Sequence, residues 1–285
     1  MSTNSKSNWQ PLHEAHSIEV AAAAVNFSQP LTEVAWKKVV RDAEGVCKAA
    51  GLGEKSVVNA VQITIGLPAG PPPPTTVDAM VFMRSQATNI PGGGLQRSAL
   101  EALTVSREGL NFQTSVYTRW DAFFERIQLL LKPPLRSALH SIAVTNLRLE
   151  YKDVFRFVGE GKPIAEELLN TCSDLIAPHV FRNEKLWHSH TGFFEDALGC
   201  KERLVQINVD ANFSATRGST EPPFRAVTIT TAVQNNLANA SAEALDNEDE
   251  IANSQILMFD SLHLRSKELF VKLISKQTAS QVGIQ

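Results

Sequence analysis

The sequence predicts an α+β fold in which antiparallel strands form sheets and helices pack on one face of them. Several segments alternate apolar and polar residues at every second position and follow one another without intervening helices. Three longer segments instead repeat apolar residues at helical spacing. Residues 16–142 and 143–285 show a similar order of segments. We therefore expect two topologically similar halves, each an antiparallel sheet with helices on one face, after a flexible N-terminus over residues 1–15.

The first half begins with an extended segment over residues 16–28, which is followed by a helix. Thr32 is the expected N-cap, apolar residues follow at helical spacing, and Gly51 is expected to end the helix. A tight turn at Glu108 and Gly109 is expected to join two later strands. The segments with period-two alternation lie near residues 57–65, 77–84, 103–105 and 110–116.

Two connections in this half have a distinctive composition. Residues 71–74 are four prolines, which favour a stiff, extended connection, and residues 91–94 are rich in glycine. A glycine-rich loop can bind phosphate through its backbone N–H groups, but such a loop precedes a helix. Here another strand follows, so we expect residues 91–94 to form a hairpin loop.

A second helix is expected to start near Thr118, where Thr118 and Asp121 form a capping pattern. Its apolar stripe continues until Pro133 and Pro134, which are expected to break or kink the helix. A short helical continuation then leads into the second half.

The second half is predicted to begin with a strand and to end with a long helix. The expected strands cover residues 144–157, 187–193, 203–213 and 224–233. A short helix is expected over residues 163–170, and the final helix over residues 250–277. Apolar residues share one face of this last helix, so we expect it to cover its own sheet. The face comprises Phe259, Leu262, Ser266, Leu269, Phe270 and Leu273.

Composition limits the classes of function. Hydrophobic residues make up 43% of the 285 residues and charged residues 20%, which is enough to build a core. The net charge of −3 lacks the basic excess typical of nucleic-acid-binding domains, so we expect no specific nucleic-acid partner. No apolar run approaches the ~20 residues that cross a bilayer, so we expect no membrane association. Three widely separated cysteines, Cys47, Cys172 and Cys200, indicate reduced thiols and a cytoplasmic protein.

The strongest metal candidate is the pair His188 and His190. Residues two apart on a strand face the same way, so both imidazoles can approach one ion. Because the sequence does not determine a third ligand, we expect no bound metal. A metal-dependent hydrolase that uses His188 and His190 is one alternative function. The candidates for a third ligand are His179, Glu184, Glu195 and Asp196.

Other patterns of catalytic chemistry are missing from the sequence. It contains no Gly-x-Ser-x-Gly elbow, and no cysteine stands in a recognisable Cys/His context. The acidic residues 246–250 lack the ligand spacing of an EF-hand and are expected to stabilise the start of a helix. His263 is expected to be a packed or capping residue. We therefore expect no cofactor and a non-enzymatic role.

Four segments carry a resemblance to a known family. They are HSIEV from residue 16 with VNFSQPL from residue 25, YTRWDAF from residue 117, LRLEYKDVF from residue 147 and SLHLRSKELF from residue 261. In this order they resemble a sporadically distributed bacterial family of unknown function. That family shares a Trp-containing helix start, an LRY-like strand and a C-terminal helix with Leu-His. Its members tend to carry Pro-Pro-Leu near the start, where this chain has Gln10, Pro11 and Leu12.

The resemblance implies no site residue. It implies an accessory gene of the kind that is found in phage-defence and toxin-linked loci. Together with the missing catalytic patterns, it leads us to expect a non-enzymatic protein that acts through a protein partner, as a homodimer or with a protein encoded nearby. The other alternative is a small-molecule-binding module with a pocket between sheet and long helix, lined by Trp120, Trp187 or Phe270.

Overall fold

The computed structural model describes residues 7–59, 77–89, 94–214, 223–238 and 247–284. The strands are β1 (Trp9–Pro11), β2 (Ile18–Phe27), β3 (Glu54–Asn59), β4 (Val77–Asn89), β5 (Leu95–Ser106), β6 (Gly109–Thr114), β7 (Val144–Phe157), β8 (Trp187–Glu195), β9 (Glu202–Ser214) and β10 (Phe224–Asn236). The helices are α1 (Glu33–Ala49), α2 (Trp120–Leu139), α3 (Ala165–Leu168), the 3₁₀ helix η1 (Pro178–Arg182), α4 (Glu248–Leu273) and α5 (Lys276–Gln281).

Within these residues, ten strands form one antiparallel sheet. Their order is β3-β4-β5-β6-β2-β7-β10-β9-β8, and β1 pairs with β7 outside this path. The predicted α+β class is confirmed. Two separate halves are not confirmed, because β2 pairs with β7 and so joins residues 16–142 to residues 143–285 in one sheet over one hydrophobic core.

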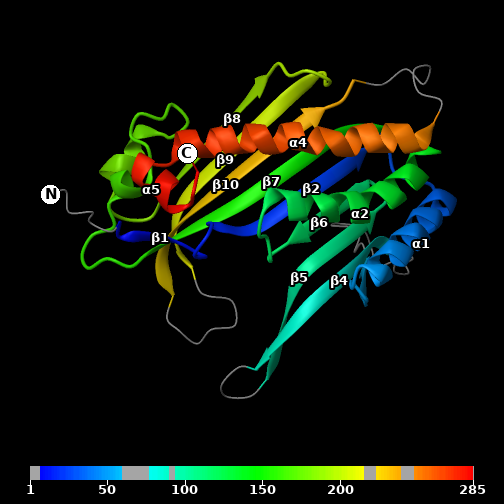
Figure 1. Cartoon of the computed structure of the whole chain (residues 1–285), viewed down its shortest axis with the longest axis horizontal. Coiled ribbons are helices and arrows are strands. Elements are labelled where there is room, and N and C mark those ends of the chain that lie inside the picture. The colour runs from blue at the N-terminus through cyan, green and yellow to red at the C-terminus, as the bar shows by residue number, and fades with distance from the viewer. Residues whose placement is uncertain (1–6, 60–76, 90–93, 215–222, 239–246, 285) are drawn as a thin grey trace, which may run out of the picture.

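The three long helices lie side by side on one face of the sheet (Figure 1). α2 packs between α1 and α4, and α4 crosses β7 and β10. Alternation along the central strands directs every second side chain towards these helices. The apolar face predicted for the last helix is buried in this way, so α4 covers its own sheet, as expected.

Helix α1 confirms the prediction from its capping residues. The side chain of Thr32 accepts a hydrogen bond from the backbone N–H of Ala35 at the start of the helix. Gly51 adopts a φ of 84° just after the last turn, a conformation that favours glycine.

Helix α2 differs from the prediction at two places. Its N-cap is Arg119, without a side-chain capping bond, so the pattern of Thr118 and Asp121 does not cap the helix. The helix also continues through Pro133 and Pro134 to Leu139. The two prolines remove backbone donors, but the surrounding turns are buried against the core, and this burial offsets the loss.

The chain also departs from the prediction near both ends. Within the segment 1–15 that we expected to be flexible, Trp9 is buried, and its indole Nε1–H donates to the carbonyl of Ile164 at 2.9 Å. The predicted short helix is limited to α3. The final helix ends at Leu273, and Ser275 caps the separate helix α5 through a bond from the N–H of Thr278.

Several predictions lie outside the described residues. They concern the end of the alternating segment at 60–65, the prolines 71–74, most of the loop 91–94 and Asp246. Among the helices that the structure describes, none combines the length and apolar character needed to span a bilayer.

Candidate functional site

A cavity of about 430 Å³ lies between the sheet and the helices α2 and α4. We name it the Asp153 cavity after a residue that lines it. The other lining residues come from the start of β2 and the segment before it, from residues 117–120 at the start of α2, from the strands β7 and β10, from the second half of α4, and from residues 282–284, which follow α5. Because α4 ends at Leu273, the chain can turn back and bring these last residues to the cavity.

An interruption between β1 and β2 shapes one wall of this cavity. Both strands pair with β7, and residues 12–17 leave the sheet between them. The excursion is held at both ends by Val154, whose carbonyl accepts from the N–H of Leu12 at 3.0 Å and whose N–H donates to the carbonyl of Ser17 at 2.8 Å. His16 and Ser17 are thereby brought to the cavity wall.

Asp153 is a carboxylic acid in the core-facing row of β7. Side chains alternate along a strand, so Asp153 points the same way as Tyr151 and Phe155, towards the helices. It is only 4% exposed, and the hydroxyl of Ser17 donates to its Oδ1 at 2.7 Å. Burial raises the pKa of Asp153 to about 7, although the hydrogen bond from Ser17 opposes the rise.

His263 lies between Trp120 and Tyr151 at the cavity wall. Its ring is parallel to that of Trp120, with centroids 4.2 Å apart and planes at 2°, and the indole Nε1–H of Trp120 donates to Asp260 at 2.8 Å. The hydroxyl of Tyr151 is 3.0 Å from Nδ1 of His263. Burial, assisted by the charge of Lys267, lowers the pKa of His263 to about 4, so the imidazole is neutral near pH 7.

Tyr117 and His16 complete the polar wall. The ring of Tyr117 meets the rings of Tyr151 and His16 edge-on, each with centroids 5.7 Å apart. Burial raises the pKa of Tyr117 to about 12, so this phenol stays protonated. Nδ1 of His16 is buried and has no hydrogen-bond partner among the described residues. Buried polar atoms without a partner are rare, so this nitrogen is a candidate contact for a ligand.

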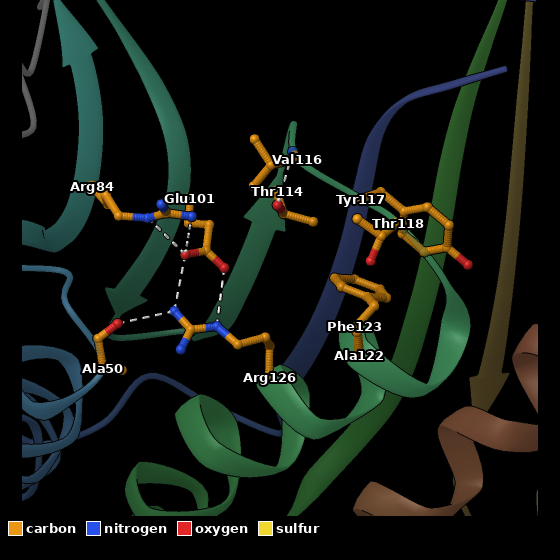
Figure 2. A pocket seen from close by; sticks show the side chains of 10 residues that line it. All are labelled: Ala50, Arg84, Glu101, Thr114, Val116, Tyr117, Thr118, Ala122, Phe123 and Arg126. Carbon is orange, nitrogen blue, oxygen red and sulfur yellow. Dashed lines mark hydrogen bonds and ion pairs between the residues drawn. The ribbon is translucent and has the colours of Figure 1, made fainter. Parts of the chain in front are cut away.

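A second cavity, of about 330 Å³, shares Tyr117 and Thr118 with the first. Figure 2 shows the side chains that line this second cavity. On its far side, Glu101 is 6% exposed and is held by two arginines. Arg126 binds both carboxylate oxygens, at 3.0 and 2.9 Å, and Arg84 binds one of them at 3.0 Å. Arg126 also donates to the carbonyl of Ala50 at 3.3 Å. These bonds link α2 to β4, β5 and the end of α1, which indicates a structural role for the second cavity.

The predicted metal candidates lie elsewhere, on β8. The rings of His188 and His190 are exposed, and their centroids are 5.3 Å apart. Nε2 of His190 lies 3.2 Å from Oδ1 of Asp210. Two of the proposed third ligands are held by other partners, Glu184 by Lys162 and Glu195 by Arg265. The part of the chain that the structure describes contains no group of three or more His, Cys, Asp or Glu side chains that is placed to hold a metal ion.

Two of the three aromatic residues named from the sequence, Trp120 and Phe270, line the Asp153 cavity, whereas Trp187 packs in the core at the start of β8. Asp153 was not singled out from the sequence. His263 was expected to be a packed or capping residue; it packs on Trp120 and also lines the cavity. A signal was present, because Asp153 interrupts an otherwise apolar core-facing row. Each of the four family-like segments contributes to this cavity, with lining residues that include His16, Tyr117, Trp120, Tyr151, His263 and Phe270.

Searches of protein-family models and of curated proteins find no match for this chain.

Proposed function

We propose that this chain binds a small molecule in the Asp153 cavity. The observation that carries the proposal is the carboxyl of Asp153, which is buried on the wall of a cavity and accepts a hydrogen bond from Ser17. Burying a carboxyl costs free energy unless a partner compensates it. A ligand group that meets this carboxyl supplies that compensation, and perturbed acids in clefts are candidates for functional sites.

The size and walls of the cavity support the proposal. A volume of about 430 Å³ falls within the range of roughly 300–1,000 Å³ that is typical of small-molecule sites. The rings of Trp120, Tyr117 and Phe270 provide apolar contact area, and Nδ1 of His16 provides an unused polar group. Such a mixture of aromatic surface with few polar groups binds and orients ligands.

Replacing Thr118 with tryptophan is expected to abolish retention of the ligand. Thr118 is exposed and lines the Asp153 cavity, so a larger side chain there fills the cavity without disturbing the core. The measurement is mass spectrometry of small molecules released by denaturing equal amounts of the purified native and variant chains. We expect a molecule that accompanies the native chain and is missing from Thr118→Trp.

The matched control is Thr88→Trp, which places the same side chain at an exposed position of β4 away from the cavity. It is expected to retain the molecule. If the native chain and Thr118→Trp release the same small molecules in equal amounts, the binding proposal is wrong.

A second candidate function is association with a protein partner, for which we propose a second copy of this chain. The outer side of α4 carries three exposed apolar residues, Leu257, Leu264 and Val271, at intervals of seven. Leu264 lies midway, so a two-fold axis at Leu264 places Leu257 of one copy against Val271 of the other. Such a row is therefore self-complementary, as a two-fold interface requires.

If this second function holds, Leu264→Glu is expected to convert a dimer into a monomer, because the charge would be buried at the centre of the contact. Sedimentation velocity of the native chain and the variant measures the change. Leu129→Glu, at an exposed position of α2, is the matched control and is expected to leave the dimer intact. A native chain that sediments as a monomer at high micromolar concentration contradicts the second function.

The finer expectations from the sequence stay proposals. Three cysteines without a disulfide support the proposed cytoplasmic location. The bacterial family of unknown function and the phage-defence or toxin-linked setting rest on the resemblance of the four segments. The metal-dependent hydrolase centred on His188 and His190 stays an untested alternative, and the prediction stays that no metal is bound.

A further inference from the structure

The Asp153 cavity carries charges of opposite sign at its buried and exposed sides. Asp153 is at the buried side, whereas Arg119 and Lys267 line the same cavity from exposed positions. Neither cation forms an ion pair within the described part of the chain. The two sides of the cavity are therefore complementary to different ligand groups.

The buried side suits a protonated amine. The carboxylate of Asp153 accepts one hydrogen bond, from Ser17, and His16 presents a buried Nδ1 without a partner. Burial lowers the pKa of His16, which favours a neutral ring that can accept a hydrogen bond. Tyr117 adds an aromatic ring to this side, and such rings attract cations through their π faces. An ammonium group offers three donors and a positive charge, which match the carboxylate of Asp153 and a neutral imidazole.

The exposed side suits an anion. The guanidinium of Arg119 and the ammonium of Lys267 can both donate to a carboxylate or a phosphate. A neutral ligand would leave the buried carboxylate of Asp153 without a charged partner and would make no use of the two cations. A ligand that carries only an anionic group would leave the carboxylate of Asp153 unpaired.

On the basis of the proposed function, we infer that the ligand is a small zwitterion. Its protonated amine pairs with Asp153, and its carboxylate or phosphate contacts Arg119 and Lys267. This inference specifies the chemical class of the ligand and the orientation in which it enters the cavity.

Isothermal titration calorimetry of the full chain at pH 8 tests the inference. The probes are ε-aminocaproate, with hexylamine and hexanoate as its single-charge analogues, and phosphoethanolamine, with ethanolamine and inorganic phosphate. At least one zwitterion is expected to bind about tenfold or more tightly than either of its own analogues, because each analogue lacks one charge-assisted contact. The two series present a carboxylate and a phosphate at different distances from the amine, so that both the longer and the shorter zwitterion are tested.

Two variants assign the contacts to residues. Asp153→Asn keeps the size of the side chain and is expected to weaken binding of the preferred zwitterion about tenfold or more, while its anionic analogue is not weakened. The double variant Arg119→Gln/Lys267→Gln is expected to weaken the same zwitterion but not its amine analogue. Circular dichroism of each variant checks that the fold is retained.

Equal affinity for a zwitterion and its analogues in both series, or no binding of any probe by the native chain, overturns the inference. The binding proposal is decided separately by the molecules released from the native chain and Thr118→Trp. A neutral or purely anionic molecule that the native chain retains and Thr118→Trp does not retain would support the binding proposal and refute the zwitterion. If the native chain and Thr118→Trp release the same small molecules in equal amounts, the binding proposal is wrong, and the zwitterion, which rests on it, is refuted with it.

Discussion

In the ligand-free chain, Asp153→Asn is expected to raise the free energy of unfolding at pH 8 by about 2–4 kcal/mol. The pKa of Asp153 is about 7 in the folded chain, against an ordinary value of 3.8. Between these values the folded chain holds a proton that the unfolded chain has lost. The folded state is therefore favoured at low pH, and stability falls by about 1.4 kcal/mol per pH unit as the pH rises towards 7.

Urea unfolding between pH 4 and pH 8 measures this effect. The free energy of unfolding of Asp153→Asn is expected to exceed that of the native chain by an amount that grows with pH and levels off above pH 7. The matched control is Asp174→Asn, an exposed aspartate, which is expected to follow the native curve. A constant difference across the pH range would mean that the carboxyl of Asp153 has a compensating partner in the folded chain.

Glu101→Gln is expected to lower the free energy of unfolding by about 2–3 kcal/mol. The substitution removes the charge that both arginines share, and it leaves them in a partly buried setting. Loss of one partner from a buried ion pair costs roughly 3–5 kcal/mol. The side chains of Arg126 and Arg84 are 26% and 44% exposed, and water reduces the penalty accordingly.

The two arginines are expected to contribute unequally to this network. Arg126 is less exposed and binds both oxygens of Glu101, so Arg126→Gln is expected to cost more than Arg84→Gln in the same urea measurements. The control is Glu184→Gln, which breaks the exposed pair with Lys162 and is expected to change stability by about 0.5 kcal/mol or less. Equal effects of Glu101→Gln and Glu184→Gln would show that the buried network does not stabilise the fold.

Local patterns were enough to predict most of the elements. The cap at Thr32 and the glycine at position 51 bounded α1, and alternation located the core strands. Local patterns failed where burial overrode them. The prolines at 133 and 134 indicated a break in α2, but the helix continues because adjacent turns pack in the core.

The candidate site was predicted only in part. Trp120 and Phe270 were named as pocket residues because aromatic side chains between a sheet and a helix are typical of ligand sites. His188 and His190 attracted attention through their spacing, yet they lie on the exposed side of β8. The spacing of two residues on a strand indicates only that both side chains lie on the same face of the sheet. It does not predict a third ligand near them.

By itself, the sequence determined the α+β class, the alternating strands and the amphipathic helices, because periodicity depends on neighbours along the chain. Only the tertiary structure decided which polar groups meet. Ser17 and Asp153 are separated by 136 positions, and Tyr151 and His263 by 112. They come together because β2 pairs with β7 and because α4 packs across β7. Pairing and packing of this kind depend on the burial of the whole core, which no local pattern encodes.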